Sequence, residues 1–550
     1  MASYTVRVGG TGNKDASVDG DPTVVGECMP LATALGESYS PGDVLLFADT
    51  GGEYPATLTT PSAGEAGTYF YQQAYPGHTP IFNGSDITTG WEAHATLPLV
   101  WQKTSITKEP SMIWFDDVRG TKKDNAAVLD TQMDWCWVAD VAYVYSATDP
   151  DAAYTKVELA ARQYCLTNNA TPYVITDGLE FKHANWLSVY VTNGSNFSEF
   201  YNCHAHDSMV GFKCGDNDCV FDSCVSEDHT GDAFGGSGDV NNPFYRLTIT
   251  GCTARRCLYT LGVNGGSASG IKAFNMNDSL ITKSEWDSNA SGGIRLDGGR
   301  LDSYGNPFRW GCNDNIVSEN LIHDNGGAGG IDGDPDQIDQ VMLEFSDRNT
   351  IKFNLVYDCF AGGYNIGLSY QEADCLVFGN ITWGASGTSV GSIRTYFGSS
   401  IEGYPNYFVG NVIDQSYFGF SLNGAGYDIL RNNIITRSTF YALRFGSAAV
   451  AANVDSDYNC FYQTPEHVVN VVSDQPYTFS EWQEAGQDVN SIDSDPLFTD
   501  PDNRDYTLQA GSPCIGAGDK SLGEPFNEAL HPSSDLDTLG GMIIVDRDDY

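Results

Sequence analysis

The sequence predicts an all-β chain folded as a single-stranded parallel β-helix, with an N-terminal cap and loop insertions on one face. One short pattern recurs through residues 202–459: apolar residues, then Asn or Cys, then apolar residues and a polar pair, as in IKFNLVYD at 351–358. Successive copies lie 21 to 36 residues apart, and a minimum near 21 residues is the length expected for one coil of a stacked solenoid. The 60 glycines and the scarcity of helical patterns agree with an all-β chain rich in turns.

A tight turn is expected at the Asn or Cys position of each copy. Asn tolerates left-handed backbone angles and hydrogen-bonds local backbone, so side chains stacked about 4.8 Å apart can form a ladder from coil to coil. We therefore predict that these corner residues lie above one another. They are Cys203, Cys224, Cys252, Ser284, Asn320, Asn354, Asn380, Asn411, Asn433 and Asn459.

The ends of the chain are predicted to close the solenoid. TVRV at 5–8 and PGDVLLF at 41–47 have the pattern of strands, with a short helix near 29–34 between them. A cap is needed because the first coil would otherwise expose an unpaired strand edge. The chain is then expected to divide into a cap at 1–60, early coils with a β-hairpin insertion at 61–175, regular coils at 176–470, and a closing segment with an acidic tail at 471–550.

Four segments carry a resemblance to known proteins. They are YFYQQAYPGHTPIFNGSDITTGW at 69–91, VLDTQMDWCWVADVAYVYSATDP at 128–150, YVITDGLEF at 173–181 and DPLFTDPDNRDYTLQAGSPCIGAG at 495–518. Their arrangement resembles right-handed parallel β-helix proteins of the polysaccharide lyase type (pectate lyase, chondroitinase B and alginate lyase) and related glycoside hydrolases. The resemblance implies a right-handed β-helix that acts on polysaccharide, although a fold alone does not choose the reaction.

Charge and hydropathy exclude several classes of partner. The chain has 28 basic and 72 acidic residues, a formal net charge of −44, which argues against nucleic acid because phosphate binding needs a basic surface. No run of about 18 apolar residues is present, so we expect no membrane insertion. The first residues lack the pattern of a signal peptide. We expect either a secreted protein in trimmed form or a virion surface protein.

The residues that follow each corner should alternate between the core and the surface. Small or apolar residues two positions past the corner, among them Ala205, Trp286 and Ile413, are expected to face the core. The next position then faces outward and brings together side chains that are remote in sequence. These outward residues are His206, Glu227, Arg255, Asp287, His323, Tyr357, Trp383, Asp414 and Thr436.

A second outward stripe is expected on the next strand of each coil. There Lys213, Arg295 and Asp332 should fall at comparable places, with Asp297 and Asp334 close to Arg295 across two coils. Carboxylates at that range raise one another's pKa unless a cation or an arginine lies between them. The expected inward anchors of this strand are Phe212, Phe234, Ile294 and Ile331.

Two acidic clusters are candidate calcium sites, because oxygen ligands on adjacent strands and a loop are what Ca²⁺ prefers. The first combines Asp228 and Asp232 with Asp207 one coil earlier. It resembles an Asp pattern that holds calcium in pectate-lyase-like β-helices, except that Asp-His stands where that pattern has two adjacent Asp residues. The second cluster, DGDPDQID at 332–339, offers Asp334, Asp336 and Asp339 beside Asp332. Cys214 and Cys219 could form a disulfide, and the sequence leaves this open.

Two reactions fit the candidate residues. β-Elimination needs a cation or arginine to neutralise a uronate carboxylate and a base to remove the neighbouring proton. Hydrolysis needs two carboxylates about 5 to 9.5 Å apart, for which Glu227 or Asp228 could act with Asp287, Asp297 or Asp332. The candidate catalytic residues are Lys213, Glu227, Asp228, Arg255, Lys283, Arg295, His323 and Asp332.

We therefore predict extracellular degradation of an acidic polysaccharide, with β-elimination preferred over hydrolysis. A virion tail spike or fibre that binds a cell-surface glycan is the main alternative, with or without glycosidase activity. A non-catalytic adhesin is a third. A secreted enzyme would be a monomer, whereas a virion spike would be a homotrimer.

Overall fold

The computed structural model describes most of the chain, in two compact units. Unit 1 comprises Met1–Gly235 with Arg256–Ala268, and unit 2 comprises Gly236–Arg255 with Ser269–Tyr550. The described residues are 2–238, 242–258, 268–298, 311–326, 339–359, 363–369, 372–384, 391–396, 402–424, 426–472, 476–519 and 521–522.

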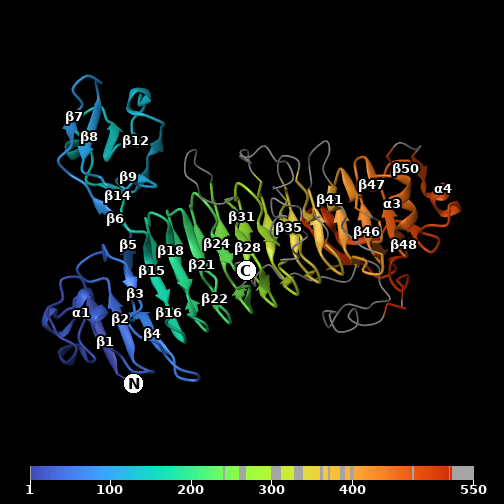
Figure 1. Cartoon of the computed structure of the whole chain (residues 1–550). Coiled ribbons are helices and arrows are strands. Elements are labelled where there is room, and N and C mark those ends of the chain that lie inside the picture. Colours follow the sequence, from blue (N-terminus) through green and yellow to red (C-terminus); the bar gives the residue numbers. More distant parts are fainter. Residues whose placement is uncertain are drawn as a thin grey trace. The chain divides into compact units, whose positions relative to one another are not determined.

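Unit 1 begins with the expected cap. β1 (Ser3–Arg7) and β2 (Val44–Ala48) pair in parallel, and α1 (Leu31–Gly36) lies between them in sequence. Three parallel sheets follow (Figure 1). Sheet 1A continues from β2 with β4 (Phe70–Ala74), β16 (Val174–Asp177), β19 (Glu199–Tyr201) and β22 (Val220–Asp222); sheet 1B has β5 (Ile81–Asn83), β17 (Glu180–Lys182), β20 (His204–His206) and β23 (Val225–Glu227); sheet 1C has β3 (Leu58–Thr59), β15 (Tyr164–Asn169), β18 (Leu187–Thr192) and β21 (Val210–Cys214).

An insertion with its own small core separates β5 from β15. The expected hairpin is present, since β12 (Asp134–Val138) pairs antiparallel with β13 (Val141–Tyr145). Trp91, Ile113 and Trp135 are buried in the core of the insertion. Its remaining elements are β6 (Ser85–Ile87), β7 (Glu92–Ala93), β8 (Val100–Thr104), β9 (Ile113–Phe115), β10 (Val118–Arg119), β11 (Thr121–Lys122), α2 (Pro150–Ala153) and β14 (Val157–Ala160).

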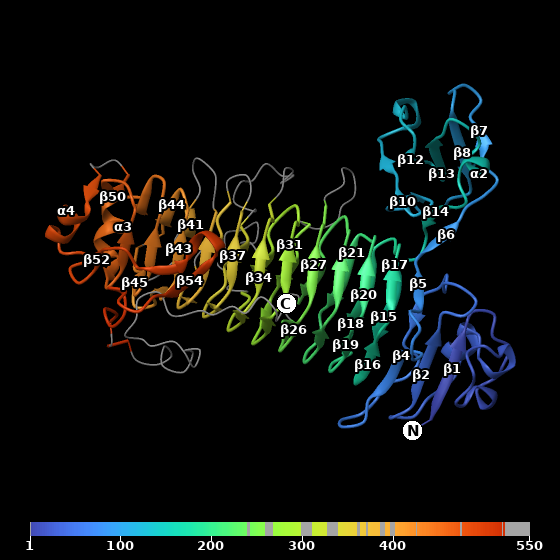
Figure 2. The same ribbon diagram turned by 180° about the vertical axis from the view of Figure 1, so that it is seen from behind.

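Unit 2 also has three sheets of mostly parallel strands, which stack side by side (Figure 2). Sheet 2A has β26 (Thr248–Thr250), β30 (Leu280–Thr282), β33 (Ile316–Ser318), β36 (Thr350–Lys352), β39 (Leu376–Phe378), β42 (Tyr407–Val409), β45 (Ile429–Arg431) and β48 (Asp455–Asp457). Sheet 2B has β27 (Thr253–Arg255), β31 (Glu285–Asp287), β34 (Leu321–His323), β37 (Leu355–Tyr357), β40 (Ile381–Trp383), β43 (Val412–Asp414), β46 (Ile434–Thr436), β49 (Cys460–Tyr462) and β52 (Ile492–Asp493). Sheet 2C has β28 (Ile271–Phe274), β32 (Ile294–Asp297), β35 (Val341–Glu344), β38 (Ile366–Leu368), β41 (Gly391–Thr395), β44 (Phe418–Leu422), β47 (Tyr441–Phe445), β50 (His467–Val471) and β51 (Tyr477–Thr478).

The remaining elements of unit 2 are short. β25 (Phe244–Tyr245) pairs with β29 (Met276–Asn277), and β53 (Phe498–Asp500) forms a hairpin with β54 (Asp505–Leu508). The helices are α3 (Ala448–Asn453) and α4 (Phe479–Glu484), the second with a capping box between Thr478 and Glu481. β24 (Phe234–Ser237) spans the boundary between the two units. Among the described residues, no helix combines the length and the apolar character that crossing a membrane requires.

The corner ladder of unit 2 is confirmed. In Asn354, for example, Oδ1 accepts hydrogen bonds from the backbone N–H and Nδ2 of Asn320, both at 3.0 Å. The same bonds continue through Asn380, Asn411, Asn433 and Asn459.

The corner Asn does not itself use the left-handed backbone angles that Asn tolerates. The residue before it has the positive φ: Glu319 at 57°, Phe353 at 56° and Tyr458 at 55°. Asn is therefore required at the corner for its hydrogen bonds rather than for its backbone freedom.

The predicted inward and outward columns of sheet 2B are also confirmed in register. Trp286, Ile322 and Val356 align in the core, and Asp287, His323 and Tyr357 align beside them on the other side of the strands. However, the later part of the outward column is not exposed. Phe498 and Tyr506 of the C-terminal hairpin pack against Trp383 and its neighbours, and Tyr506 donates a hydrogen bond to Asp414 at 2.8 Å.

Candidate functional site

Three charged residues meet on sheet 2C, on the side of the strands that faces away from the core. Ile294 and Leu296 are buried in the core, so the alternating residues Arg295 and Asp297 point to the other side. The next strand places Glu344 directly beside Asp297. One guanidinium nitrogen, Arg295 Nη2, lies 2.6 Å from Glu344 Oε2 and 3.4 Å from Asp297 Oδ2. Those two distances limit the separation of the two carboxylate oxygens to 6.0 Å at most.

The three side chains are withdrawn from solvent, since Arg295, Asp297 and Glu344 are 3%, 5% and 7% exposed. Burial is the main cause that raises the pKa of Glu344 above its ordinary value, and the Asp297 carboxylate acts in the same direction while Arg295 opposes it. A buried carboxyl group beside a second carboxylate tends to keep its proton. The site therefore brings together two carboxyl groups, one of them with a raised pKa, and acid–base catalysis uses such a pair.

A row of basic residues runs along the same face. Lys272 aligns with Arg295, and Arg394, Ser421 and Arg444 align with one another on later strands. Four basic side chains on one face are a local concentration of positive charge in a chain with 28 basic and 72 acidic residues.

Arg394 is held firmly within this row. Its Nε donates to Asp339 Oδ2 at 3.0 Å, and its guanidinium lies over the Tyr364 ring. Gly367 makes room for this pair, because a Cβ there would lie 1.8 Å from Asp339 Oδ2.

The sequence identified Arg295 and Asp297 but missed Glu344. We expected Ile331 to align with Ile294 and so to bring Asp332 and Asp334 to Arg295. This register is wrong, because Ile294 pairs with Val341. Asp332 and Asp334 themselves lie outside the described residues. The alternation in VMLEF at 341–345 is the signal that could have identified Glu344, since it places Met342 and Glu344 on one side of a strand.

The other predicted catalytic residues lie elsewhere. Lys213 aligns with Tyr190 on sheet 1C, and burial lowers its pKa while Asp232 opposes that shift. Lys283 is largely exposed and its Nζ lies 3.9 Å from Glu319. Arg255 aligns with Asp287 on sheet 2B.

His323 lies among three carboxylates on sheet 2B. It contacts Asp324 at 2.8 Å, Glu285 at 3.3 Å and Asp287 at 3.5 Å, and its ring stacks on Tyr357. Burial lowers the pKa of His323, but the hydrogen bonds to Glu285 and Asp324 outweigh this and raise it. A raised pKa favours the protonated imidazole, which disfavours a role for His323 as a base.

Glu227 and Asp228 belong to a separate charged cluster in unit 1. Arg256 lies 2.7 Å from each of them. His204 contacts Glu227 at 3.1 Å. Asp207, one coil earlier, is bound by Arg119 of the insertion at 2.9 Å. The sequence did not identify Arg119, because no local pattern relates the insertion to the coil that it contacts. It also did not identify His204, which directly follows the corner residue Cys203 on β20.

His206 supplies a pH-dependent contribution to the stability of unit 1. It lies 3.1 Å from Glu180 and 3.0 Å from Asp207. Burial lowers the pKa of His206, but the hydrogen bonds to Asp207 and Glu180 outweigh this effect and raise the pKa to about 9. Because the folded-state pKa exceeds the unfolded value of 6.5, the contribution is complete below pH 6.5 and is lost as the pH rises through about 9.

We therefore expect the wild-type melting temperature to fall between these pH values more steeply than that of His206→Gln. The difference corresponds to at most about 3 kcal/mol, at 1.36 kcal/mol per pKa unit. Differential scanning calorimetry across this range measures it. Parallel curves for the two proteins would contradict the assignment.

The predicted calcium ligands have other partners where they are described. Asp207 and Asp228 pair with arginines, and Asp339 is buried against Arg394. Asp232 is buried, whereas Asp334 and Asp336 lie outside the described residues. Calcium binding stays a prediction. Cys214 and Cys219 are buried free thiols, so the disulfide that the sequence left open is not formed.

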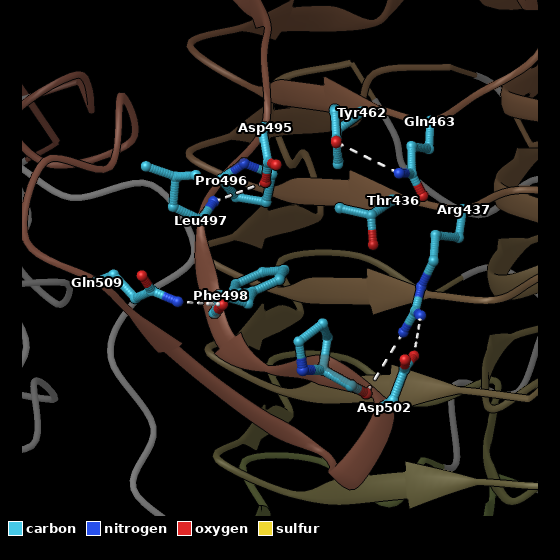
Figure 3. Close-up of a pocket in the computed structure, with 11 residues that line it drawn as sticks. Thr436, Arg437, Tyr462, Gln463, Asp495, Pro496, Leu497, Phe498, Asp502 and Gln509 are labelled. Carbon is cyan, nitrogen blue, oxygen red and sulfur yellow. Dashed lines mark hydrogen bonds and ion pairs between the residues drawn. The ribbon is translucent and has the colours of Figure 1, made fainter.

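A pocket of about 310 Å³ lies between sheet 2B and the C-terminal hairpin (Figure 3). Arg437 points from β46 toward Asp502, and it also pairs with Asp414. The charged residues that line this pocket are Arg437, Asp495 and Asp502, so the lining is net negative. That charge disfavours an acidic ligand, and sheet 2C remains the better candidate for the active site.

Comparisons with known proteins agree with the fold. Residues 187–334 match the family model described as "Right handed beta helix region". The solved structure of XylC with xylose is similar, with a TM-score of 0.53, 12% identity, and coverage of 90% of this chain and 87% of that one. A structure named glycoside hydrolase gives a TM-score of 0.47 at 10% identity, covering 88% and 100% of the two chains. Pectate lyase Pel9A gives 0.39 at 12% identity, covering 95% and 93%.

These identities are low, so the likeness concerns the fold and not the reaction. A search of the curated proteins finds no match to this sequence. The stacked parallel sheets, the matched region and the likeness to XylC agree with one another. The chain is a right-handed parallel β-helix protein.

Proposed function

We propose that this protein hydrolyses glycosidic bonds in an acidic polysaccharide, with Glu344 as the general acid and Asp297 as the second carboxylate. The observation that carries the proposal is the pair of neighbouring carboxylates bridged by Arg295, in which the pKa of Glu344 is raised. Glycoside hydrolysis requires such a pair, one member protonated and the other ionised.

The reaction follows from the position of the two groups. Glu344 donates its proton to the glycosidic oxygen as the bond to the anomeric carbon breaks. Asp297 attacks that carbon and forms a glycosyl ester, which water then cleaves with Glu344 acting as the base. We infer this double displacement because the two carboxyl groups lie closer than the about 6.5–9.5 Å that inverting enzymes need for a water molecule. Glu344 Oε2 and Asp297 Oδ2 are at most 6.0 Å apart, and the two side chains share a hydrogen bond. Arg295 holds both carboxylates in place.

The basic row of sheet 2C supports an acidic substrate. Lys272, Arg295, Arg394 and Arg444 lie along one face of a protein whose net charge is −44. Uronate carboxylates are the natural partners of arginine, which binds them through two parallel hydrogen bonds. We propose an extracellular or virion-surface location, where such polymers are accessible.

β-Elimination, which the sequence favoured, has less support on this face. It needs a base that is in its unprotonated form and lies next to the proton that it removes. Arg295 and Arg394 remain protonated at any working pH and therefore cannot take that proton. Two carboxylates are instead the requirement of hydrolysis.

The test is incubation with uronate polymers of different linkage, such as pectate and alginate, and with a neutral glucan as the control. We expect new reducing ends on an acidic polymer only. These products should lack the ultraviolet absorbance of unsaturated uronate. Unsaturated products would show elimination instead, and the lack of products from every polymer would overturn the proposal.

The pH dependence of the reaction is a separate prediction. Glu344 must carry a proton to act as the acid, so kcat/KM should fall as the pH rises through the raised pKa of this group. A profile of kcat/KM from pH 4 to 9 measures the basic limb. A rate that stays constant, or that increases, as Glu344 ionises would contradict its assignment as the acid.

A further inference from the structure

Arg444 is a basic residue of sheet 2C that lacks an acidic partner. Its Nη1 donates to Ser421 Oγ at 3.0 Å and to Asn423 Oδ1 at 3.2 Å. Within the described parts of the chain it makes no ion pair, whereas Arg295 and Arg394 of the same row each bind a carboxylate. In a protein with 72 acidic residues, an arginine held by neutral groups keeps its full charge for a ligand.

An aromatic cluster adjoins this arginine. The Arg444 guanidinium lies 5.4 Å from the centre of the Phe418 ring. Phe418 stacks on Tyr441, and Tyr417 stacks on Phe440 with centroids 4.9 Å apart and planes 10° apart. Phe440 also meets Tyr441 edge to face at 4.5 Å.

Part of this cluster is open to solvent, because Phe440 is 44% exposed. Exposed rings that are held by their neighbours offer a flat apolar face and lose little side-chain conformational entropy when a ligand binds. Such a face suits the C–H side of a sugar ring.

Both features lie on the same sheet as the proposed catalytic pair. The order of strands in sheet 2C runs β35, β38, β41, β44 and β47, so Glu344 and Arg444 are four strands apart. At about 4.8 Å per strand this is about 19 Å. A polymer chain that occupies the catalytic pair and follows the sheet would therefore reach Arg444 several sugar units away.

We propose that Arg444 and the aromatic residues Tyr417, Phe418, Phe440 and Tyr441 form a distal subsite for a carboxylated sugar of the bound polysaccharide. Arg444 binds the uronate carboxylate and the ring of Phe440 stacks on the sugar. The inference rests on the proposed function for the identity of its ligand. It adds the requirement that affinity depends on chain length, because only longer chains span both places.

Binding in the inactive Glu344→Gln protein tests the subsite. Isothermal titration calorimetry compares uronate oligosaccharides of two and eight units with a neutral oligosaccharide. We expect Arg444→Ala to weaken binding of the octamer at least tenfold, since a charge-assisted hydrogen bond contributes about 1.5–3 kcal/mol. Binding of the dimer should be unchanged.

Phe440→Ala, at a position that is 44% exposed, should weaken octamer binding several-fold for charged and neutral oligosaccharides alike. Arg348→Ala is the matched control, because Arg348 is exposed and paired with Asp314 on the turn after sheet 2C. Arg348→Ala should bind the octamer with the same affinity as the Glu344→Gln protein that lacks this second change.

Arg444→Lys should recover part of the affinity that Arg444→Ala loses, because it restores the charge but not the bidentate geometry.

The two proposals can fail separately. Equal affinity of the parent and Arg444→Ala for the octamer would overturn the subsite, even if Glu344→Gln were inactive. Persistent activity of Glu344→Gln would overturn the catalytic assignment, while a selective loss of octamer binding in Arg444→Ala would still support the subsite. An equal loss for dimer and octamer would show a general disturbance of the sheet and would also overturn the subsite.

Discussion

Replacing Glu344 with Gln is expected to lower kcat on the acidic polysaccharide by about 10²–10⁴-fold, the usual contribution of a general acid. Gln has the same shape but cannot supply the proton to the leaving oxygen. Initial rates of reducing-end formation measure the loss. Glu319→Gln is the control, since Glu319 is a half-exposed carboxylate on a turn and should keep wild-type activity.

The chemical nature of the defect can be tested directly. An aryl uronoside with a good leaving group needs no proton, so Glu344→Gln should retain most of its activity on that substrate. Asp297→Asn should lose activity on both substrates, because attack on the anomeric carbon is required in either case. If Glu344→Gln were equally impaired on both substrates, Glu344 would not be the acid.

The second large effect concerns the corner ladder. Asn380 is fully buried and makes four hydrogen bonds through its side chain. Its Oδ1 accepts from the backbone N–H and Nδ2 of Asn354, and its Nδ2 donates to Ile351 O and Asn411 Oδ1. Asn380→Ala would remove the acceptor of the Asn354 backbone N–H and a donor to Ile351 O, whereas Asn411 Oδ1 would keep its bond from the backbone N–H of residue 380. We expect the free energy of unfolding to fall by about 3–5 kcal/mol, as each buried unpaired group costs about 1–3 kcal/mol.

Equilibrium denaturation in urea measures this change. Asn490→Ala serves as the control, because the Asn490 side chain makes an exposed hydrogen bond to Asp457 and its loss should cost less than about 1 kcal/mol. Asn380→Asp should also destabilise, because the carboxylate can accept but cannot donate. A loss below about 1 kcal/mol for Asn380→Ala would show that the ladder does not contribute to stability.

The corner residues and the alternation beside them could be predicted from the sequence, and the structure confirms both. Asn354 and Asn380 occupy the same place in successive copies of one pattern, and Trp286 and Ile322 follow their corners at a constant offset. Such positions are determined locally. The spacing from corner to strand is constant, and alternation along a strand then assigns each side chain to the core or to the surface.

The candidate site could be predicted only in part. Arg295 and Asp297 follow from alternation around Ile294 and Leu296, but their partner does not. The chain between β32 and β35 contains β33 and β34 together with connecting segments of irregular length, and no local rule states where the next strand of sheet 2C begins after them. A wrong strand register led us to expect Asp332 beside Arg295 and Asp297. Hydrogen bonding between the strands places Glu344 beside Asp297 instead.

The β-helix, its corner ladder and the direction of most side chains follow from short periodic patterns along the chain. The residues that meet across an insertion or under a returning segment do not follow from such patterns. Tertiary structure pairs Asp297 with Glu344 and covers Trp383 with the C-terminal hairpin. The physical reason is that such contacts join residues far apart along the chain, and their partners are chosen by packing and strand pairing rather than by any spacing visible in the sequence.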